Sequence, residues 1–246
     1  MDKMLYVAMT GAKNTMIAQA INNNNLANVN TVGFRADLAS FQSLPINGTG
    51  YQSRINSVVK GTNVDLASGP LLSTGRDLDI AVKDEGLIAV QAPDGSEAYT
   101  RSGNMQINNA GILVTGAGTP VLGNSGPIAV PPHDKISIGA DGTISMLPVG
   151  QTPNTLVIVD RIKLTKAPAG EMVKSSDGLL RTTGGDVLPT DSSITVQSGV
   201  VESSNVNSIN ALTNMIELAR HYEAQVKMIK TAEDNDTAST QLLRMA

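Results

Sequence analysis

The residues that break helices are unevenly distributed along this chain of 246 residues. There are 23 glycines and 11 prolines, yet neither type occurs after Gly199. Proline breaks helices and glycine weakens them, whereas both are common in turns. We therefore predict an α+β fold. Long helices at the two ends of the chain should flank a central all-β region that is sandwich-like or barrel-like.

The N-terminal region, residues 1–41, is predicted to be a helical stem segment. Apolar residues recur there at spacings of three or four, at Leu5, Met9, Ala12, Met16 and Ala20. This is the period of a helix with one apolar face. Gly33 provides a stop signal. Few charges lie on this helix, so we expect even its outer face to contact protein.

Asparagines gather where this helix should end. Six of the nine residues from Asn22 to Asn30 are asparagine. An amide side chain both donates and accepts hydrogen bonds, so it can satisfy backbone groups at a helix end. We predict that Asn25, Asn28 and Asn30 make contacts that fix how the first helix turns into the following segment. The alternative is a polar linker of biased composition.

The middle of the chain has the pattern of short strands and turns. Asp94, Asp141 and Asp177 are each followed by glycine, and short apolar or alternating runs lie between such turns. Strands of about five residues with frequent turns predict a β-sandwich or barrel-like domain, which we place at residues 76–200. Residues 42–75, which are punctuated by glycine, are predicted to be an extended connector.

Residues 201–246 are predicted to form a second helix that carries two apolar stripes. The first stripe consists of Ile209, Leu212, Ile216 and Ala219. The second, adjacent stripe consists of Met215, Leu218, Tyr222, Val226 and Ile229. Two stripes imply more than one packing partner. We expect the first to pack on the N-terminal helix in a coiled-coil-like stem, and the second to pack on another partner.

Several functional classes are disfavoured by composition and motifs. The net charge of −4 offers no basic surface for nucleic acid. No apolar run reaches about 18 residues, so no membrane span is expected, and no signal peptide pattern is visible. Cysteine is absent and the only histidines are His133 and His221, so we predict no metal site and no cofactor. Without a P-loop, GxGxxG or GxSxG motif we predict no catalytic residues and no enzyme.

Three long stretches resemble the flagellar basal-body rod and hook proteins. They are NNLANVNTVGFR at 24–35, the β-region from DLDIAVKDEGLIAVQ to GTPVLG, and VESSNVNSINALTNMIELARHYEAQVKMIKT at 201–231. They span nearly the whole chain in the family's order. Within the family, the opening MDKMLYVAMTGA and the ending QLLRM are most similar to proximal rod subunits. After Glu233-Asp234 the chain departs from the family, since Asn235 replaces a frequent methionine. We expect residues 232–240 to be held most weakly.

The resemblance implies a structural axial subunit of the bacterial flagellum, located in the rod that crosses the periplasm. Such a subunit is exported by the flagellar type III apparatus without a cleaved signal. It then polymerises head-to-tail with itself and other rod subunits through its terminal helices, and the rod transmits torque. The subunit contacts we expect are Leu5, Met9, Ala12, Met16, Asn25, Asn28, Asn30, Arg35, Ile209, Leu212, Met215, Ile216, Leu218, Tyr222, Val226 and Ile229.

Alternatives remain open for single residues and for the whole chain. Arg35 is either a solvated charge or an ion pair or amide contact across subunits, whereas Arg101 is better explained as a structural residue of the β-domain. The stripes could also pack only within the chain. A distal rod or hook-family axial subunit is the second choice within the family. A secreted β-rich binding module and a periplasmic enzyme acting on peptidoglycan are the alternatives of another class.

Overall fold

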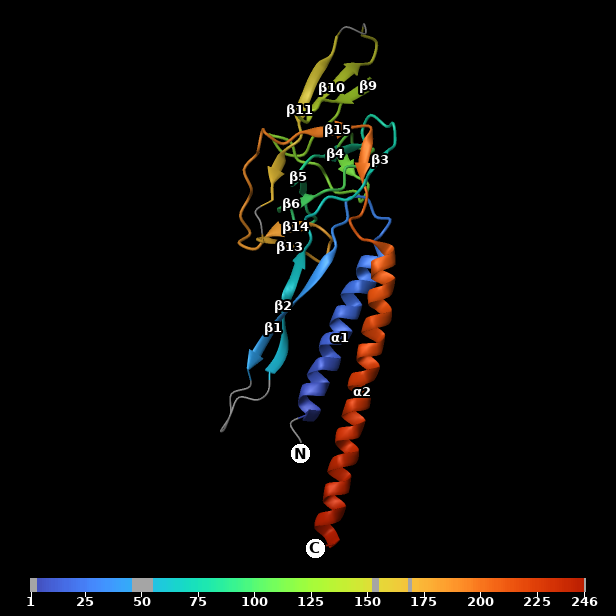
Figure 1. Cartoon of the computed structure of the whole chain (residues 1–246). Coiled ribbons are helices and arrows are strands. Elements are labelled where there is room, and N and C mark those ends of the chain that lie inside the picture. Colours follow the sequence, from blue (N-terminus) through green and yellow to red (C-terminus); the bar gives the residue numbers. More distant parts are fainter. Residues whose placement is uncertain (1–3, 46–54, 152–154, 168–169, 246) are drawn as a thin grey trace. The chain divides into compact units, whose positions relative to one another are not determined.

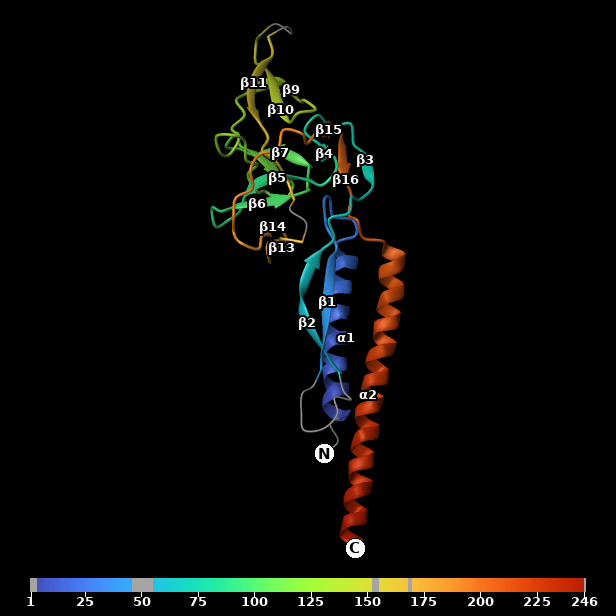
Figure 2. The same ribbon diagram turned by 60° about the vertical axis from the view of Figure 1, so that its left-hand side comes forward.

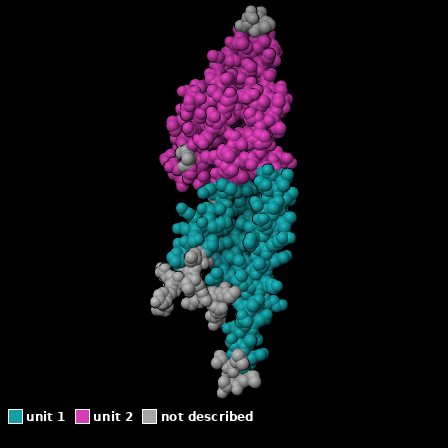
Figure 3. All heavy atoms as spheres, viewed as in Figure 1, with its two compact units in different colours: residues 1–27, 37–63, 207–246 teal, residues 28–36, 64–206 magenta. Residues whose placement is uncertain are grey.

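A computed structural model gives the fold of the chain and describes residues 4–45, 55–151, 155–167 and 170–245. A long helix lies at each end of the sequence and a β-region lies between them, which confirms the predicted α+β class (Figure 1). The chain divides into two compact units (Figure 3). The first unit comprises residues 1–27, 37–63 and 207–246, and the second comprises residues 28–36 and 64–206.

The first unit contains the two long helices, α1 (Met4–Ala27) and α2 (Ser208–Met245). They pack along each other (Figures 1 and 2). At Gly11 of α1, a Cβ atom would lie 3.0 Å from the side chain of Gln225. Nearer the other end, Asn22 donates a hydrogen bond of 2.8 Å from Nδ2 to the carbonyl oxygen of Ala211. In the described part of the chain, no helix is apolar over a length sufficient to cross a membrane.

The face that α2 turns toward α1 differs from the expected one. Both contact positions on α2 belong to a buried or half-buried row with heptad spacing, which comprises Ala211, Met215, Leu218, Tyr222, Gln225, Ile229 and Ala232. Most members of the second predicted stripe lie in this row. Three of the four members of the first stripe are exposed, with Ile209 at 73%, Leu212 at 50% and Ile216 at 58%, and Ala219 is half-buried. The assignment of the first stripe to the N-terminal helix is therefore wrong.

The buried apolar side chains of α1 are also smaller than the sequence pattern predicts. Ala8 and Ala12 are the buried apolar residues of α1, whereas Met9 and Met16 are more than half exposed. Small side chains at a contact let two helix backbones approach closely. The close approach therefore selects alanine and glycine for the shared face, and the large methionines remain outside it.

The first helix ends much earlier than residue 41. It stops at Ala27, and the chain turns back so that Asn25 bonds the backbone of Asp37 twice. Asn25 Nδ2 donates to the carbonyl oxygen of Asp37 and the amide of Asp37 donates to Asn25 Oδ1, both at 2.8 Å. This pair of bonds imitates a backbone pair, and a strand begins at the same residue, β1 (Asp37–Pro45).

The segment expected to be an extended connector is largely paired. β1 pairs with β2 (Ile55–Val64) in a two-stranded sheet. The Nδ2 of Asn14 in α1 donates to the carbonyl oxygen of Ser57 in β2 at 2.7 Å. The second helix also begins later than expected, because Asn207 caps it. The Oδ1 of Asn207 accepts from the amides of Ile209 and Asn210, at 3.0 and 3.1 Å.

The second unit is built from short strands that pair in antiparallel register. The five-stranded sheet has the order β12 (Leu164–Lys166), β5 (Gly86–Gln91), β6 (Glu97–Thr100), β14 (Leu180–Thr182) and β13 (Met172–Lys174). The three-stranded sheet has the order β11 (Val157–Arg161), β10 (Thr143–Pro148) and β9 (His133–Ile138). The two-stranded pairs are β15 (Val196–Ser198) with β4 (Ile80–Val82), β16 (Val200–Glu202) with β3 (Leu71–Ser73), and β7 (Met105–Ile107) with β8 (Leu113–Thr115).

Strand β5 of the five-stranded sheet is buried on both faces. Side chains alternate along a strand, and in β5 Ile88 and Val90 join the large core while Leu87 and Ala89 join a second, smaller cluster. All four are 0–1% exposed. This explains why the sequence of the strand is a continuous apolar run. A sandwich or barrel-like closure of the region remains a prediction.

The three predicted Asp-Gly turns are confirmed, and their carboxylates are held by hydrogen bonds. Gly95, Gly142 and Gly178 have φ values of 82°, 82° and 80°. Hydrogen bonds from Thr143 to Asp141 lower the pKa of that carboxyl, since its Oδ2 accepts from Thr143 Oγ1 at 2.6 Å. Ser96 lowers the pKa of Asp94 in the same way.

These turns predict a loss of stability in acid. Because the folded-state pKa is lowered, their contribution is fully present above the ordinary aspartate pKa of about 4 and is lost as the pH falls through the folded-state value. We expect urea midpoints, followed by circular dichroism, to fall steeply below about pH 4. Asp141→Asn keeps an acceptor oxygen without a charge, so its midpoint should fall less steeply than that of the wild-type protein. An unchanged slope in this variant would contradict the assignment.

Candidate functional site

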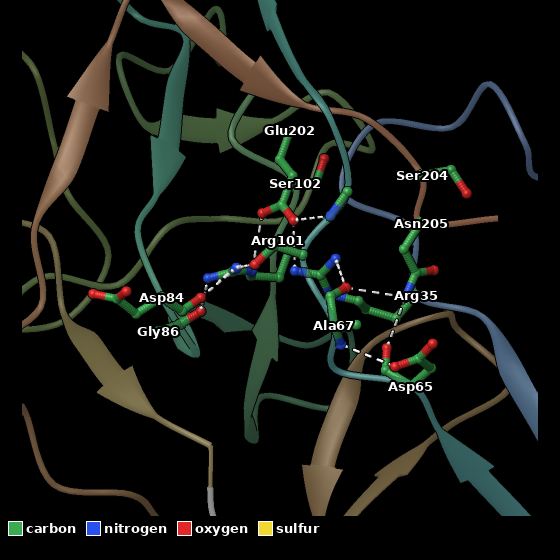
Figure 4. A network of polar contacts seen from close by, with 12 residues as sticks. Arg35, Asp65, Ala67, Asp84, Gly86, Arg101, Ser102, Glu202, Ser204 and Asn205 are labelled. Carbon is green, nitrogen blue, oxygen red and sulfur yellow. Dashed lines mark hydrogen bonds and ion pairs between the residues drawn. The ribbon is translucent and has the colours of Figure 1, made fainter. Parts of the chain in front are cut away.

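A buried carboxylate lies between two arginines in the second unit (Figure 4). Glu202 ends strand β16, and its Oε1 accepts a hydrogen bond of 2.7 Å from Nη2 of Arg35. Its Oε2 lies 3.0 Å from Nε of Arg101, an ion pair without hydrogen-bond geometry. The three residues are only 1–2% exposed. We call Arg35, Arg101 and Glu202 the buried charge network.

Backbone groups satisfy most of the remaining polar atoms of this network. Glu202 Oε1 also accepts from the amide of Gly69 at 2.7 Å, and Arg35 Nη1 donates to the carbonyl oxygen of Ala67 at 2.8 Å. Arg101 donates to the carbonyl oxygens of Asp84 and Gly86. Burial lowers the pKa of Arg101 to about 10, and the charge of Glu202 opposes this shift. Arg101 therefore stays charged at neutral pH.

The network joins the three segments through which the second unit continues into the first. These connecting segments are residues 28–36, 64–69 and 202–206. The amide of Gly33 donates to the carbonyl oxygen of Glu202 at 2.7 Å. Asn205 Oδ1 accepts from the amide of Ala36 at 2.8 Å. Asn205 Nδ2 donates to the carbonyl oxygen of Asp65 at 3.0 Å (Figure 4). These bonds thus tie the three connecting segments to one another within the second unit.

The two arginines differ in how they match the sequence-based expectations. Arg101 is a structural residue of the β-region, as predicted. Arg35 is not a solvated charge, because it is buried and its ion pair lies within its own chain. Its expected contact across subunits remains untested. Sequence reasoning missed Glu202, although one signal was present, since a lone carboxylate follows the apolar pair Val200 and Val201.

Gly33 lies against the network in a conformation that glycine favours. Its φ is +68°, and a Cβ atom would lie 2.3 Å from the backbone amide nitrogen of Ser102. We expect Gly33→Ala to destabilise the protein by at least about 2 kcal/mol in thermal unfolding, since it adds a backbone clash to an unfavourable φ. Gly75 has the same φ of +68° but open space around it. Gly75→Ala is therefore the matched control and should cost only about 1 kcal/mol. Equal losses in the two variants would contradict the clash.

The predicted subunit contacts fall into two groups by exposure. The half-buried or buried members are Leu5, Ala12, Asn25, Asn28, Arg35, Met215, Leu218, Tyr222 and Ile229. The exposed members are Met9, Met16, Asn30, Ile209, Leu212, Ile216 and Val226. Asn25 holds the turn after α1, and Asn28 Oδ1 accepts from Thr31 Oγ1 at 3.1 Å. Tyr6, at 55% exposure, is a further large exposed residue of α1 that the stripe did not include.

Two rows of exposed apolar side chains therefore run along the helices of the first unit. We call them the exposed helix stripes. The α1 stripe consists of Tyr6, Met9 and Met16, and the α2 stripe consists of Ile209, Leu212 and Ile216. Each of the six is at least half exposed. Because contiguous exposed apolar surface marks protein interaction sites, these rows are the candidate interaction surface of the first unit.

Comparison with known proteins places the chain in a family. A family model described as flagella basal body rod protein matches residues 5–35, one described as flagellar hook protein FlgE/F/G D1 domain matches 81–146, and one described as flagellar basal body rod FlgEFG protein C-terminal matches 197–242. The chain belongs to the flagellar basal-body rod protein family. As a member of this family it is a structural protein rather than an enzyme.

Within the family, the chain is similar over its whole length to rod proteins named FlgF. The chain is 43% identical to FlgF of Salmonella typhimurium and 42% identical to FlgF of Escherichia coli, with 100% of each chain covered in both cases. It is 32% identical to FlgG of Bacillus subtilis, over 95% of this chain and 96% of that protein.

Proposed function

We propose that this chain is a structural subunit of the proximal flagellar rod. The full-length identity of 43% with the rod protein FlgF of Salmonella typhimurium carries this proposal. The lower identity of 32% with FlgG of Bacillus subtilis makes a distal rod subunit the second choice. In the rod, which crosses the periplasm, the subunit is part of the shaft that transmits torque from the motor to the hook.

The chain polymerises head-to-tail through its terminal helices in this proposal. Support comes from the exposed helix stripes, whose members Met9, Met16, Ile209 and Ile216 are each more than half exposed in the described chain. Head-to-tail contacts between unlike surfaces generate an open helical filament. The heptad-spaced row between α1 and α2 supports a coiled-coil-like stem. The partners are other copies of this chain and other rod subunits. The subunit reaches the rod through the flagellar type III export apparatus.

Limited proteolysis tests the role of the helices. Positions 233–241 of α2 are all exposed, and an isolated helix that lacks packing partners opens easily. We expect protease to cleave both terminal helices in the purified monomer and to spare the β-region. In assembled rods the same helices should be protected. If protease leaves both terminal helices of the monomer intact, assembly through the helices is contradicted. A secreted β-rich binding module with a stable stalk would give that result.

A further inference from the structure

A small cavity lies beside the buried charge network in the second unit. Its volume is about 20 Å³, which is enough for one water-sized molecule or one monatomic ion. Three parts of the unit line it, namely the segment 28–36, the end of β6 with the residue after it, and the β13–β14 hairpin. The lining residues are Gly33, Phe34, Arg35, Thr100, Arg101, Lys174, Gly178 and Leu180. A ligand of that size would lie against both arginines of the network.

The lining of this cavity is positively charged. Arg35, Arg101 and Lys174 contribute three cationic side chains, and no aspartate or glutamate is among the described residues that line the cavity. Within the buried charge network, the single carboxylate of Glu202 balances only one of the two guanidinium groups (Figure 4). Asp84 also attracts Arg101, but it is exposed, and an exposed partner contributes little. The buried groups therefore retain one positive charge, which is costly in a medium of low polarity.

Two hydrogen-bond donors of the lining residues have no acceptor among the described residues. Arg35 uses Nη1 for the carbonyl oxygen of Ala67 and Nη2 for Glu202, whereas its buried Nε has no partner there. Thr100 Oγ1 accepts from the amide of Ser102 at 3.1 Å, so its hydroxyl hydrogen is left to donate elsewhere. Buried donors are normally paired, because an unpaired one lowers stability. A single acceptor with a negative charge would satisfy both the donors and the excess positive charge.

Lys174 brings its charge to the same wall through two defined contacts. Its Nζ donates to the carbonyl oxygen of Arg35 at 2.7 Å and lies 3.8 Å from the centroid of the Phe34 ring. Both contacts are made to residues that line the cavity. An ammonium group in this place adds to the positive potential that attracts anions.

We propose that this cavity binds one monovalent anion of about the size of chloride, held by Arg35 Nε, the Thr100 hydroxyl and the charge of Arg101. A water molecule could accept from both donors, but it would leave the buried positive charge without compensation. Sulfate and phosphate, with four oxygens each, exceed the volume. The anion binds only the folded chain, so it stabilises the fold by mass action. It completes the network that ties the three connecting segments together, which is a role beyond the proposed function.

Unfolding of the full chain in different salts tests the site in solution. Urea unfolding is followed by circular dichroism at constant ionic strength, while sodium gluconate is replaced stepwise by sodium chloride or sodium bromide. Gluconate is too large for the cavity. The folding equilibrium constant should rise with halide concentration, by about tenfold when the halide reaches ten times its Kd. Equal stability in halide and in gluconate would overturn the proposal.

Two substitutions of Thr100 separate the site from a general effect of salt. Thr100→Val replaces the hydroxyl by a methyl group of similar volume, so it should weaken halide binding at least about tenfold. Thr100→Ser keeps the donor and is the matched control, with a halide affinity within about threefold of wild type. A general effect of halide would stabilise all three chains equally, and that result would overturn the site.

Bromide scatters X-rays anomalously, so crystals grown in sodium bromide locate the ion. An anomalous peak is expected within hydrogen-bonding distance of Arg35 Nε and Thr100 Oγ1, and it should be lost in crystals of Thr100→Val. An ordered water molecule at that position, without anomalous signal, would overturn the proposal. None of these measurements requires rod assembly, so their outcome leaves the proposed function untouched.

Discussion

Replacing Glu202 by alanine should destabilise the protein by about 3–5 kcal/mol, the largest single-residue effect on folding that we expect. Removing one partner from a buried ion pair leaves the other charge without compensation in a medium of low polarity. Here two guanidinium groups, those of Arg35 and Arg101, would be left without their carboxylate, and the amide of Gly69 would lose its acceptor. A loss of this size is a large fraction of the roughly 5–15 kcal/mol that typically separates folded and unfolded domains.

Urea unfolding of purified Glu202→Ala, followed by circular dichroism, measures this effect. Glu85→Ala is the matched control, since Glu85 is an exposed carboxylate of the same unit, and it should change stability by less than about 0.5 kcal/mol. Hydrogen exchange at the Gly33 and Gly69 amides provides a local readout, because both donate to Glu202. A Glu202→Ala loss below about 1 kcal/mol, the range of exposed pairs, would contradict the buried network.

Replacing Ile216 by glutamate should abolish assembly while leaving the monomer folded. Ile216 is 58% exposed in the monomer, so a charge there remains hydrated before assembly. In the rod the same position would be covered by a neighbour, and an unpaired buried charge costs several kcal/mol. About 1.4 kcal/mol corresponds to a tenfold change in affinity, so we expect a loss of more than about a hundredfold per contact. Swimming in soft agar and the yield of sedimentable rods measure the effect.

Val187→Glu is the control for a general effect of exposed charges. Val187 is 63% exposed and lies in the second unit, outside the terminal helices. The circular dichroism and thermal unfolding of both variants should match those of the wild-type protein. If Ile216→Glu cells swim normally, or if both variants fail equally, the helices are not the specific surface of assembly.

The order of elements was readable from the sequence, but the packing faces were not. Glycine and proline spacing indicated helix, β-region and helix, and the Asp-Gly pairs marked turns that the structure contains. The stripes failed as packing predictors because a stripe of large apolar residues can face either a partner in the chain or a neighbour outside it. The close contact of α1 and α2 lies at Gly11, and the buried apolar residues of α1 are alanines, residue types that carry little apolar signal.

The other differences between prediction and structure arise from contacts between residues that are distant in the sequence. The helix end depends on Asn25 meeting the backbone of Asp37, and β2 depends on pairing with β1. Neither pairing has a strong local pattern. The buried charge network joins residues 167 positions apart, Arg35 and Glu202. The sequence allowed us to predict an ion pair for Arg35, but nothing in the local sequence identifies Glu202 as the other member of that pair.

Imaging of purified basal bodies tests the central claim most directly. In the source bacterium, deletion of the gene for this chain should leave basal bodies with only the innermost rod, and expression of the wild-type chain should restore the full rod and hook. The Ile216→Glu chain should fail to restore them, although it is made and folded. Complete rods and hooks in the deletion strain would contradict the assignment of this chain to the proximal rod.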